Sequence, residues 1–291
     1  EIWPDPVTKK ISGINQITYK VLDKRYCLMQ LDLAKPLKID SVYQRNKKLL
    51  FDNIYNFYYV HIDSKRKTDS IKVFYSGTPK ESLNPPWDGG TVWSTDSLGR
   101  PWVSVACQYP GASVWFPCKN ALYDEPDNGA SLAIRVADTL VAVANGHLIE
   151  KSRHTDNTIT FKWQVIHPIN HYGIAYYIGK YTPLHYSYNG EKGPLPIDFW
   201  ILDYHSGRAE HHLIPETVQA LNSLERWFGP YPFYEDGCKI VESPYIGMEH
   251  QSAIAYGNKY QNGYNGIDLS TSGVGMLFDF IIIHESGHEY W

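Results

Sequence analysis

The sequence His284-Glu285-Ser286-Gly287-His288 places two imidazoles four residues apart, with a carboxylate directly after the first. In an α-helix, positions i and i+4 lie one above the other on the same face. Two neutral imidazoles there can hold one Zn²⁺ at about 2.0–2.1 Å for each Zn–N bond. Glu285 is turned about 100° around the helix axis, where it can reach a water on the metal. The H-E-x-x-H spacing therefore predicts a zinc site with Glu285 as general base.

The segment before this motif predicts a buried helix. Ser270, Thr271 and Ser272 offer N-cap hydroxyls. The residues that follow are apolar on almost every face, namely Val274, Met276, Leu277, Phe278, Phe280, Ile281, Ile282 and Ile283. Polar residues at the end of such a helix need partners, because an unpaired buried polar group costs about 2–7 kcal/mol. The alternative to a metal is a pair of core histidines whose hydrogen bonds are satisfied by the protein.

Composition indicates an ordinary folded protein and excludes several function classes. Of 291 residues, 43% are hydrophobic and 20% are charged, and the net charge of −4 gives no basic field that would attract nucleic acid. The aromatic share of 14% favours β structure. No apolar stretch reaches the ~18 residues of a membrane span. We expect a soluble protein whose compartment stays open, periplasmic or secreted if a signal peptide precedes residue 1.

The four cysteines give no sign of a second metal site. Cys27, Cys107, Cys118 and Cys238 form no C-x-x-C pair, so a zinc ribbon or a thioredoxin-like site is unsupported. A bond between Cys107 and Cys118 across a hairpin is one interpretation. Free and mostly buried thiols are the favoured one.

The first two-thirds of the chain has the pattern of strands and turns. Short β-branched or aromatic runs predict strands at residues 14–21, 28–33, 57–63, 70–75, 102–107, 131–137, 158–165, 173–178 and 197–204. A loop rich in Pro, Gly and Trp is expected from Pro79 to Pro101.

After residue 205 the pattern becomes helical. Pro215 opens a segment whose apolar residues recur at three- and four-residue steps, and Gly229-Pro230 ends it. We therefore expect a mostly β domain over residues 1–205 and the start of an α+β domain over residues 206–291. Near this boundary His205, His211 and His212 are expected to be solvated histidines of a linker rather than a second metal site.

Ile246-Gly247-Met248-Glu249-His250 lies upstream of the histidine motif, and here the chain resembles the aminopeptidase N family of zinc metallopeptidases (gluzincins), which also contains the leukotriene hydrolases. That family carries a G-x-M-E-N loop at a comparable distance ahead of H-E-x-x-H. Further segments are similar to family motifs, in family order: Trp115-Phe116-Pro117-Cys118 with Asp124-Glu125-Pro126 (F-P-C…D-E-P), Val143-Ala144-Asn145-Gly146 (S-N-G), and Leu224 to Pro232 (F-G-x-Y-P).

The resemblance implies an N-terminal saddle-like β domain followed by the start of a thermolysin-like catalytic domain, one bound zinc ion, and release of single residues from the free amino end of peptides. His284 and His288 match the family's zinc-ligating histidines, and Glu285 matches its general base. Glu249 matches the carboxylate that holds the α-ammonium of the substrate. Gly247 and Met248 match backbone positions that run beside the peptide.

The sequence also departs from the family pattern. Ile246 replaces the first glycine of the loop, and His250 replaces its asparagine. Gln108, ten residues before Cys118, is similar to a glutamine near the family's specificity pocket, but its spacing differs. The family's third zinc ligand is a glutamate roughly eighteen residues past the second histidine, which completes a His₂Glu set. That position, and the tyrosine that supports the oxyanion, would lie beyond Trp291, so the resemblance predicts a fragment that is inactive alone.

Two other functions remain open from the sequence. A thermolysin-type endopeptidase would share the zinc motif, and a non-catalytic binding module would keep the fold without turnover. The position of Glu249 discriminates, because an exopeptidase needs this carboxylate next to the metal.

Overall fold

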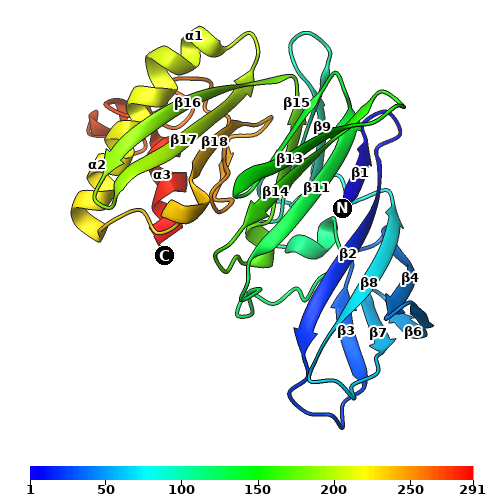
Figure 1. Ribbon diagram of the computed structural model, residues 1–291. Coiled ribbons are helices and arrows are strands. Elements are labelled where there is room, and N and C mark those ends of the chain that lie inside the picture. The colour runs from blue at the N-terminus through cyan, green and yellow to red at the C-terminus, as the bar shows by residue number, and fades with distance from the viewer. Residues whose placement is uncertain (291) are drawn as a thin grey trace.

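The computed structural model describes residues 1–290, and its largest element is an eight-stranded sheet that carries the N-terminus (Figure 1). The strand order is β13-β14-β11-β1-β2-β8-β4-β5, antiparallel throughout except for the parallel pair β1 and β11. The strands are β1 (Ile2–Asp5), β2 (Lys10–Lys20), β4 (Lys38–Gln44), β5 (Lys47–Leu49), β8 (Thr68–Gly77), β11 (Ala130–Ala137), β13 (His147–Arg153) and β14 (Thr158–Val165).

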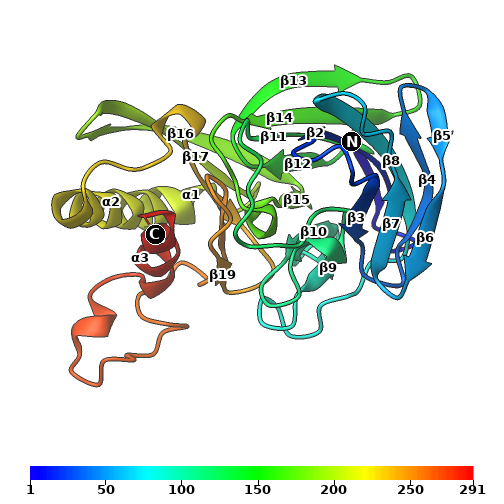
Figure 2. The ribbon, with the colours of Figure 1, turned by 90° about the horizontal axis from the view of Figure 1, so that it is seen from below.

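Two smaller sheets lie inside the curve of the large one (Figure 2). The three-stranded sheet contains β3 (Leu28–Asp32), β7 (Phe57–His61) and β6 (Phe51–Ile54). The four-stranded sheet contains β12 (Val141–Ala144), β15 (Tyr176–Gly179), β10 (Pro101–Ala106) and β9 (Gly90–Thr95). Alternate residues of β14, such as Phe161 and Trp163, are buried in the core between the sheets, as period-2 alternation requires. The mostly β fold class is confirmed.

Two details of the sequence-based prediction are wrong. The segment from Pro79 to Pro101 is not all loop, because it contains β9, which pairs with β10. The strand predicted at 173–178 begins only at Tyr176, because His171–Gly173 forms a 3₁₀ turn capped by the Asn170 side chain.

A third sheet and its helices make up the rest of the chain. The sheet has the order β16-β17-β18-β20-β19, with strands β16 (Tyr181–Gly190), β17 (Gly193–Leu202), β18 (Cys238–Glu242), β20 (Ile254–Tyr256) and β19 (Gly247–Met248). The helices are α1 (Ser206–Arg208), which runs through a π-helical turn (Ala209–Leu213) into α2 (Ile214–Phe228), and α3 (Phe280–Gly287). The predicted helix after Pro215 is thus confirmed, and α2 packs against α3.

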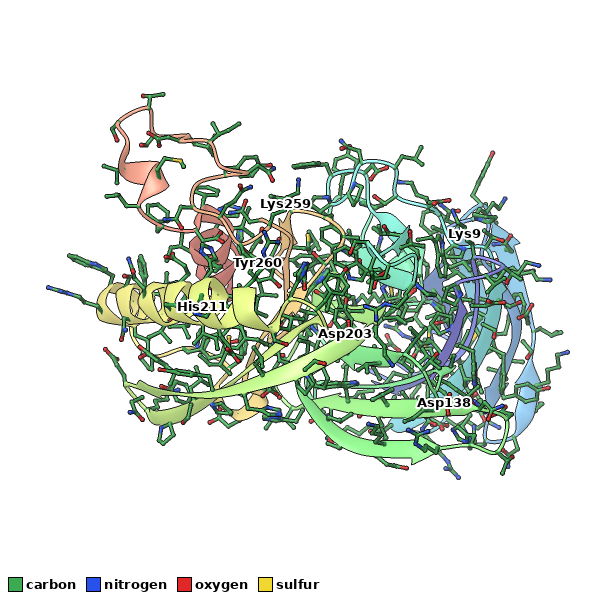
Figure 3. The ribbon with its side chains drawn as sticks, turned by 90° about the horizontal axis from the view of Figure 1, so that it is seen from above. Lys9, Asp138, Asp203, His211, Lys259 and Tyr260 are labelled. Carbon is green, nitrogen blue, oxygen red and sulfur yellow. The ribbon has the colours of Figure 1, made fainter. Side chains whose placement is uncertain are left out.

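The two parts share a tight junction. Asp203 lies between them (Figure 3) and accepts two hydrogen bonds from Arg100, at 2.7 and 2.9 Å. The core of the first part extends into the third sheet, since Val241 of β18 and Ala255 of β20 belong to it. A domain boundary near residue 205 therefore stays a prediction.

A long excursion separates β20 from α3. It is closed at its base, where Gly263 N donates to Phe278 O at 2.8 Å and Asn262 Nδ2 donates to Met276 O at 3.1 Å. Beyond this base the chain projects away from α3 (Figure 2, orange).

Within residues 1–290, no helix combines the length and the apolar character needed to cross a membrane. The four cysteines are free thiols. Cys107, Cys118 and Cys238 are buried, and burial raises the pKa of the Cys107 thiol to about 12. The prediction of free, mostly buried thiols is therefore confirmed.

Candidate metal centre

The helix that carries the histidine motif begins at Phe280 and is capped by Asp279. The Asp279 carboxylate accepts hydrogen bonds from the backbone of Ile281 at 3.1 Å and of Ile282 at 3.5 Å. The N-caps predicted at Ser270, Thr271 and Ser272 are therefore wrong. Their segment instead folds around the side chain of Asp268, which accepts from Ser270 N and Gly275 N. Val274, Met276 and Leu277 are exposed rather than buried in a helix.

Asp279 also fastens α3 to its surroundings. Its Oδ2 lies 2.7 Å from the Tyr256 hydroxyl and 3.0 Å from His212 Nε2, and its Oδ1 accepts from Asn258 at 2.8 Å. Its own backbone N–H donates to Glu216 of α2 at 2.8 Å. Asp279 is 1% exposed, so its carboxylate is shielded from water and fixes the start of the helix.

We expect Asp279→Ala to lower the free energy of unfolding by about 2 kcal/mol or more. The loss of an N-cap costs about 0.5–2 kcal/mol, and the Tyr256 hydroxyl is left buried without the acceptor of its proton, at about 1–3 kcal/mol, whereas the Asn258 amide keeps Gln261 O and Gly263 O as acceptors. Urea denaturation measures the change. Asp279→Asn keeps one acceptor oxygen and should lose clearly less. A loss below about 1 kcal/mol for the alanine variant would contradict the role of the cap.

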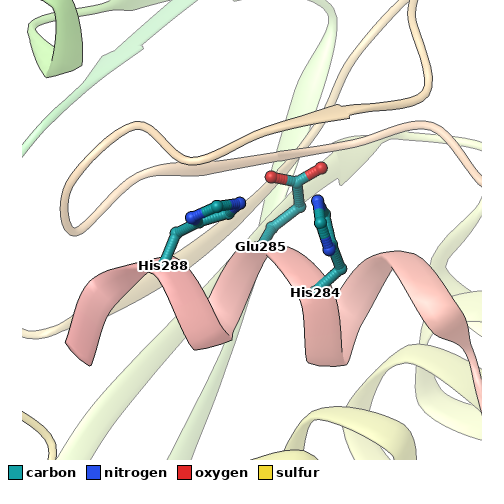
Figure 4. Close-up of side chains that lie close together, drawn as sticks. All are labelled: His284, Glu285 and His288. Carbon is teal, nitrogen blue, oxygen red and sulfur yellow. The ribbon is translucent and has the colours of Figure 1, made fainter. Parts of the chain in front are cut away.

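His284 and Glu285 of α3, and His288 of the 3₁₀ turn (His288–Tyr290) that continues it, project from the same side of the helix (Figure 4). Their candidate ligand atoms lie within 4.8 Å of one another. The two imidazole rings are 4.8 Å apart between centroids and nearly perpendicular, at 85°. Phe280, one turn earlier, stacks on the His284 ring at 5.2 Å and holds its plane. This arrangement follows directly from i, i+4 spacing on a helix.

The electrostatics of the three residues suit a cation. Both histidines are exposed, whereas Glu285 is 5% exposed. Burial, and then the neighbouring His288, lower the pKa of His284, so this ring stays neutral as a metal ligand must. Burial, and then the charge of Glu249, raise the pKa of Glu285 to about 8. Two neutral imidazoles four residues apart are donors that fit Zn²⁺, and a cation beside Glu285 would favour the ionised form of its carboxyl group.

Gly247 brings strand β19 into contact with α3. A Cβ atom at Gly247 would lie 2.3 Å from Oε1 of Glu285 and 2.8 Å from Cγ2 of Ile281. Only glycine allows the strand to approach the buried carboxylate so closely. Within the described residues, β19 is the last strand in the order of its sheet, so no other strand pairs with its outer edge, where an extended peptide could add as a further strand.

Glu249 follows this strand and lies beside the motif. Its charge acts on both His284 and Glu285, which are far from it in sequence. It also faces Tyr172 of the 3₁₀ turn, where burial, the charge of Glu249 and a hydrogen bond to it raise the pKa of the tyrosine to about 12. The structure thus brings Glu249, Glu285 and the two imidazoles to one place.

Other residues singled out in the sequence lie elsewhere. Gln108 is exposed after β10, and within residues 1–290 no hydrogen bond joins its side chain to the histidine motif, so its role stays a prediction. The expectation of solvated histidines is wrong for two of three. His205 Nδ1 lies 2.7 Å from Glu242, and His212 contacts Asp279. His211 is exposed.

Sequence reasoning missed three residues near the site. Asp279 was not singled out, although Asp before an apolar helical run is a recognised N-cap signal. Tyr172 carried no local signal. Asn145 was noted only as part of a family motif, although its side chain donates a hydrogen bond to Gln251 O, two residues past Glu249.

No protein-family model and no curated protein matches the chain. Solved structures do. The M1 zinc metallopeptidase from Deinococcus radiodurans superposes with a TM-score of 0.74 at 16% identity, covering 97% of this chain and 60% of that one. A mutant of that enzyme bound to a Tyr-Ser-Ala substrate gives 0.72 at 17% identity, covering 89% and 59%.

The fold is therefore that of the M1 zinc metallopeptidases, of which this chain spans about 60% of the length. Yeast LTA4 hydrolase shares it, with a TM-score of 0.71 at 16% identity, covering 99% of this chain and 42% of that one. The resemblance to the aminopeptidase N family is confirmed at the level of the fold.

Proposed function

We propose that these residues belong to a zinc aminopeptidase, which releases single residues from the free amino end of peptides. One observation carries the proposal. The charge of Glu249, which directly follows the edge strand β19, acts on His284 and Glu285 of the histidine motif, and this supports a carboxylate that binds the amino end of a peptide next to a zinc ion.

His284 and His288 would hold one Zn²⁺, and a third protein ligand would complete the usual set of a catalytic zinc site. When bound, the zinc ion would lower the pKa of a water and polarise the scissile carbonyl. Glu285, sheltered against Gly247, would be the general base that takes a proton from the attacking water and returns it to the departing amine. Gly247 and Met248 offer backbone groups to the substrate along the edge of β19.

Glu249 determines which end of the peptide is cut. Its carboxylate can pair with a free α-ammonium by charge-assisted hydrogen bonds, which a blocked terminus cannot form. A fixed distance between this carboxylate and the scissile bond limits each cycle to one residue. Tyr172 would support this carboxylate through the hydrogen bond between the two side chains.

We expect Glu249→Gln to raise KM for leucine p-nitroanilide by about 10- to 100-fold, since a hydrogen bond to a charged group contributes about 1.5–3 kcal/mol. The measurement uses the longest natural form of the protein that contains residues 1–291. Glu210→Gln, which changes an exposed carboxylate in the π-helical turn, is the matched control and should behave as wild type.

The same assay with N-acetyl-leucine p-nitroanilide separates the alternatives. The wild type should leave the blocked substrate uncut. Equal cleavage of both substrates would favour an endopeptidase of thermolysin type, and failure to cut any peptide with zinc present would favour a binding module.

A further inference from the structure

Hydrogen bonds from the first part of the molecule hold the loop that follows Glu249. The Tyr177 hydroxyl lies 2.7 Å from Ala253 O and 2.6 Å from His250 Nδ1. A hydroxyl has one proton, so Tyr177 donates to the carbonyl and accepts from His250 Nδ1–H. Both side chains are fully buried, and burial lowers the pKa of His250 to about 3, so the ring is neutral. Tyr177 therefore fixes both ends of residues 250–253.

Asn145 fixes the middle of the same loop. Its Nδ2 donates to Gln251 O at 2.6 Å and to Gly173 O at 2.8 Å, and its Oδ1 accepts from Ala175 N at 2.8 Å. The side chain is 4% exposed and uses both of its donors. One amide thus ties the loop after Glu249 to the 3₁₀ turn that carries Tyr172.

The neighbouring residue extends this connection to α3. Gly146 N donates to Ser252 Oγ at 2.9 Å, and Ser252 N donates to Glu289 at 2.9 Å, directly after His288. A Cβ atom at Gly146 would lie 1.9 Å from Gln164 O, and its φ is +71°, so glycine is required here. The turn at 145–146 therefore contacts a loop that is itself bonded to the end of the histidine motif.

We propose that Asn145 is a positioning residue for Glu249. By joining Gln251 to the Tyr172 turn, it fixes where the Glu249 carboxylate lies relative to α3, and so sets how tightly the enzyme captures a free α-ammonium. This inference rests on the proposed aminopeptidase function. It assigns to the β domain a part in substrate recognition beyond that of a support.

The test is Asn145→Asp, which has nearly the same shape but presents oxygen in place of both donors to the carbonyls of Gln251 and Gly173. We expect KM for leucine p-nitroanilide to rise about tenfold, with kcat within about twofold of wild type. Hydrogen exchange of the amides of residues 249–253 should be about tenfold faster in the same variant, a readout that does not depend on turnover.

A double variant shows whether the effect passes through Glu249. In a Glu249→Gln background, Asn145→Asp should raise KM no further, because the two changes remove the same interaction. Additive effects on KM would overturn the proposal. Tyr177→Phe removes only a hydroxyl that bonds to the same loop, and it is the variant to use if Asn145→Asp does not fold. Unchanged KM and unchanged hydrogen exchange in Tyr177→Phe would also refute the proposal.

Gln44→Glu is the matched control. Gln44 is 2% exposed, and its amide donates to Tyr19, Asp63 and Asp69 in the first sheet, away from the loop. It should lose stability with KM unchanged. If Asn145→Asp behaves like this control, its role is structural only. If the wild type cuts peptides with blocked and free amino termini equally, the proposed function fails instead. In that case the positioning role is still tested by hydrogen exchange, and unchanged exchange of the amides of residues 249–253 in Asn145→Asp would reject it.

Discussion

Glu285→Gln is expected to bind zinc like the wild type and to hydrolyse leucine p-nitroanilide about 100- to 10,000-fold more slowly, with the loss in kcat. Glutamine has the shape of glutamate and fits against Gly247, where an added Cβ would lie 2.3 Å from the carboxylate. It cannot accept a proton from water at the pH of the assay. The measurement combines steady-state kinetics with zinc content by mass spectrometry.

Glu225→Gln is the control for this prediction. Glu225 is 3% exposed and accepts hydrogen bonds from Tyr231 N and Glu191 N, away from the histidine motif. Its replacement should lower stability and leave kcat of the folded enzyme unchanged. Undiminished turnover by Glu285→Gln would show that another group takes the proton.

His288→Ala is expected to weaken zinc binding by more than about 100-fold and to abolish hydrolysis. The variant leaves one imidazole from α3 in place of the pair whose centroids are 4.8 Å apart. Competition with a fluorescent chelator measures the affinity at fixed pH, since protons compete with the metal for the ring nitrogens.

His211→Ala is matched to this change, because His211 is an exposed imidazole in the π-helical turn, next to His212. It should leave zinc affinity unchanged. Equal zinc affinity in the wild type and in His288→Ala would show that His288 is not a zinc ligand and would contradict a zinc site at the histidine motif.

The parts of the fold that the sequence predicted are those with a strong local period. Residues 158–165 alternate between buried and half-exposed positions and form β14 with the predicted bounds. The amphipathic segment after Pro215 forms α2. In both cases the side chains that face the core recur at the period of the element.

The helix before His284 shows where this reasoning failed. The apolar residues from Val274 to Ile283 look continuous in sequence, but hydrogen bonds from the loop backbone to the Asp268 side chain compete with helix formation. Gly273 adopts φ +87°, which also stops a helix there. Apolar composition alone did not distinguish an exposed loop from a buried helix.

Some residues of the candidate site could also be predicted from local spacing in the sequence, and others could not. His284 and His288 could be paired from spacing alone, because a helix fixes i and i+4 on one face. The place of Glu249 beside them came from a family resemblance, since no local pattern joins it to α3. The bond between Tyr177 and His250 spans 73 residues, and no local signal in the sequence predicts such a contact.

The hydrogen bond between Gly263 N and Phe278 O at the base of the excursion affects how far the length of this loop can change during evolution. Because hydrogen bonds join the two chain segments at this base, the loop beyond it can be lengthened, shortened or cut by a protease while Glu249 and α3 keep their relative positions. The number of residues between the two motifs is therefore free to drift over evolution. A fluorescent label or an epitope placed at its tip would report on the molecule without disturbing the chemistry.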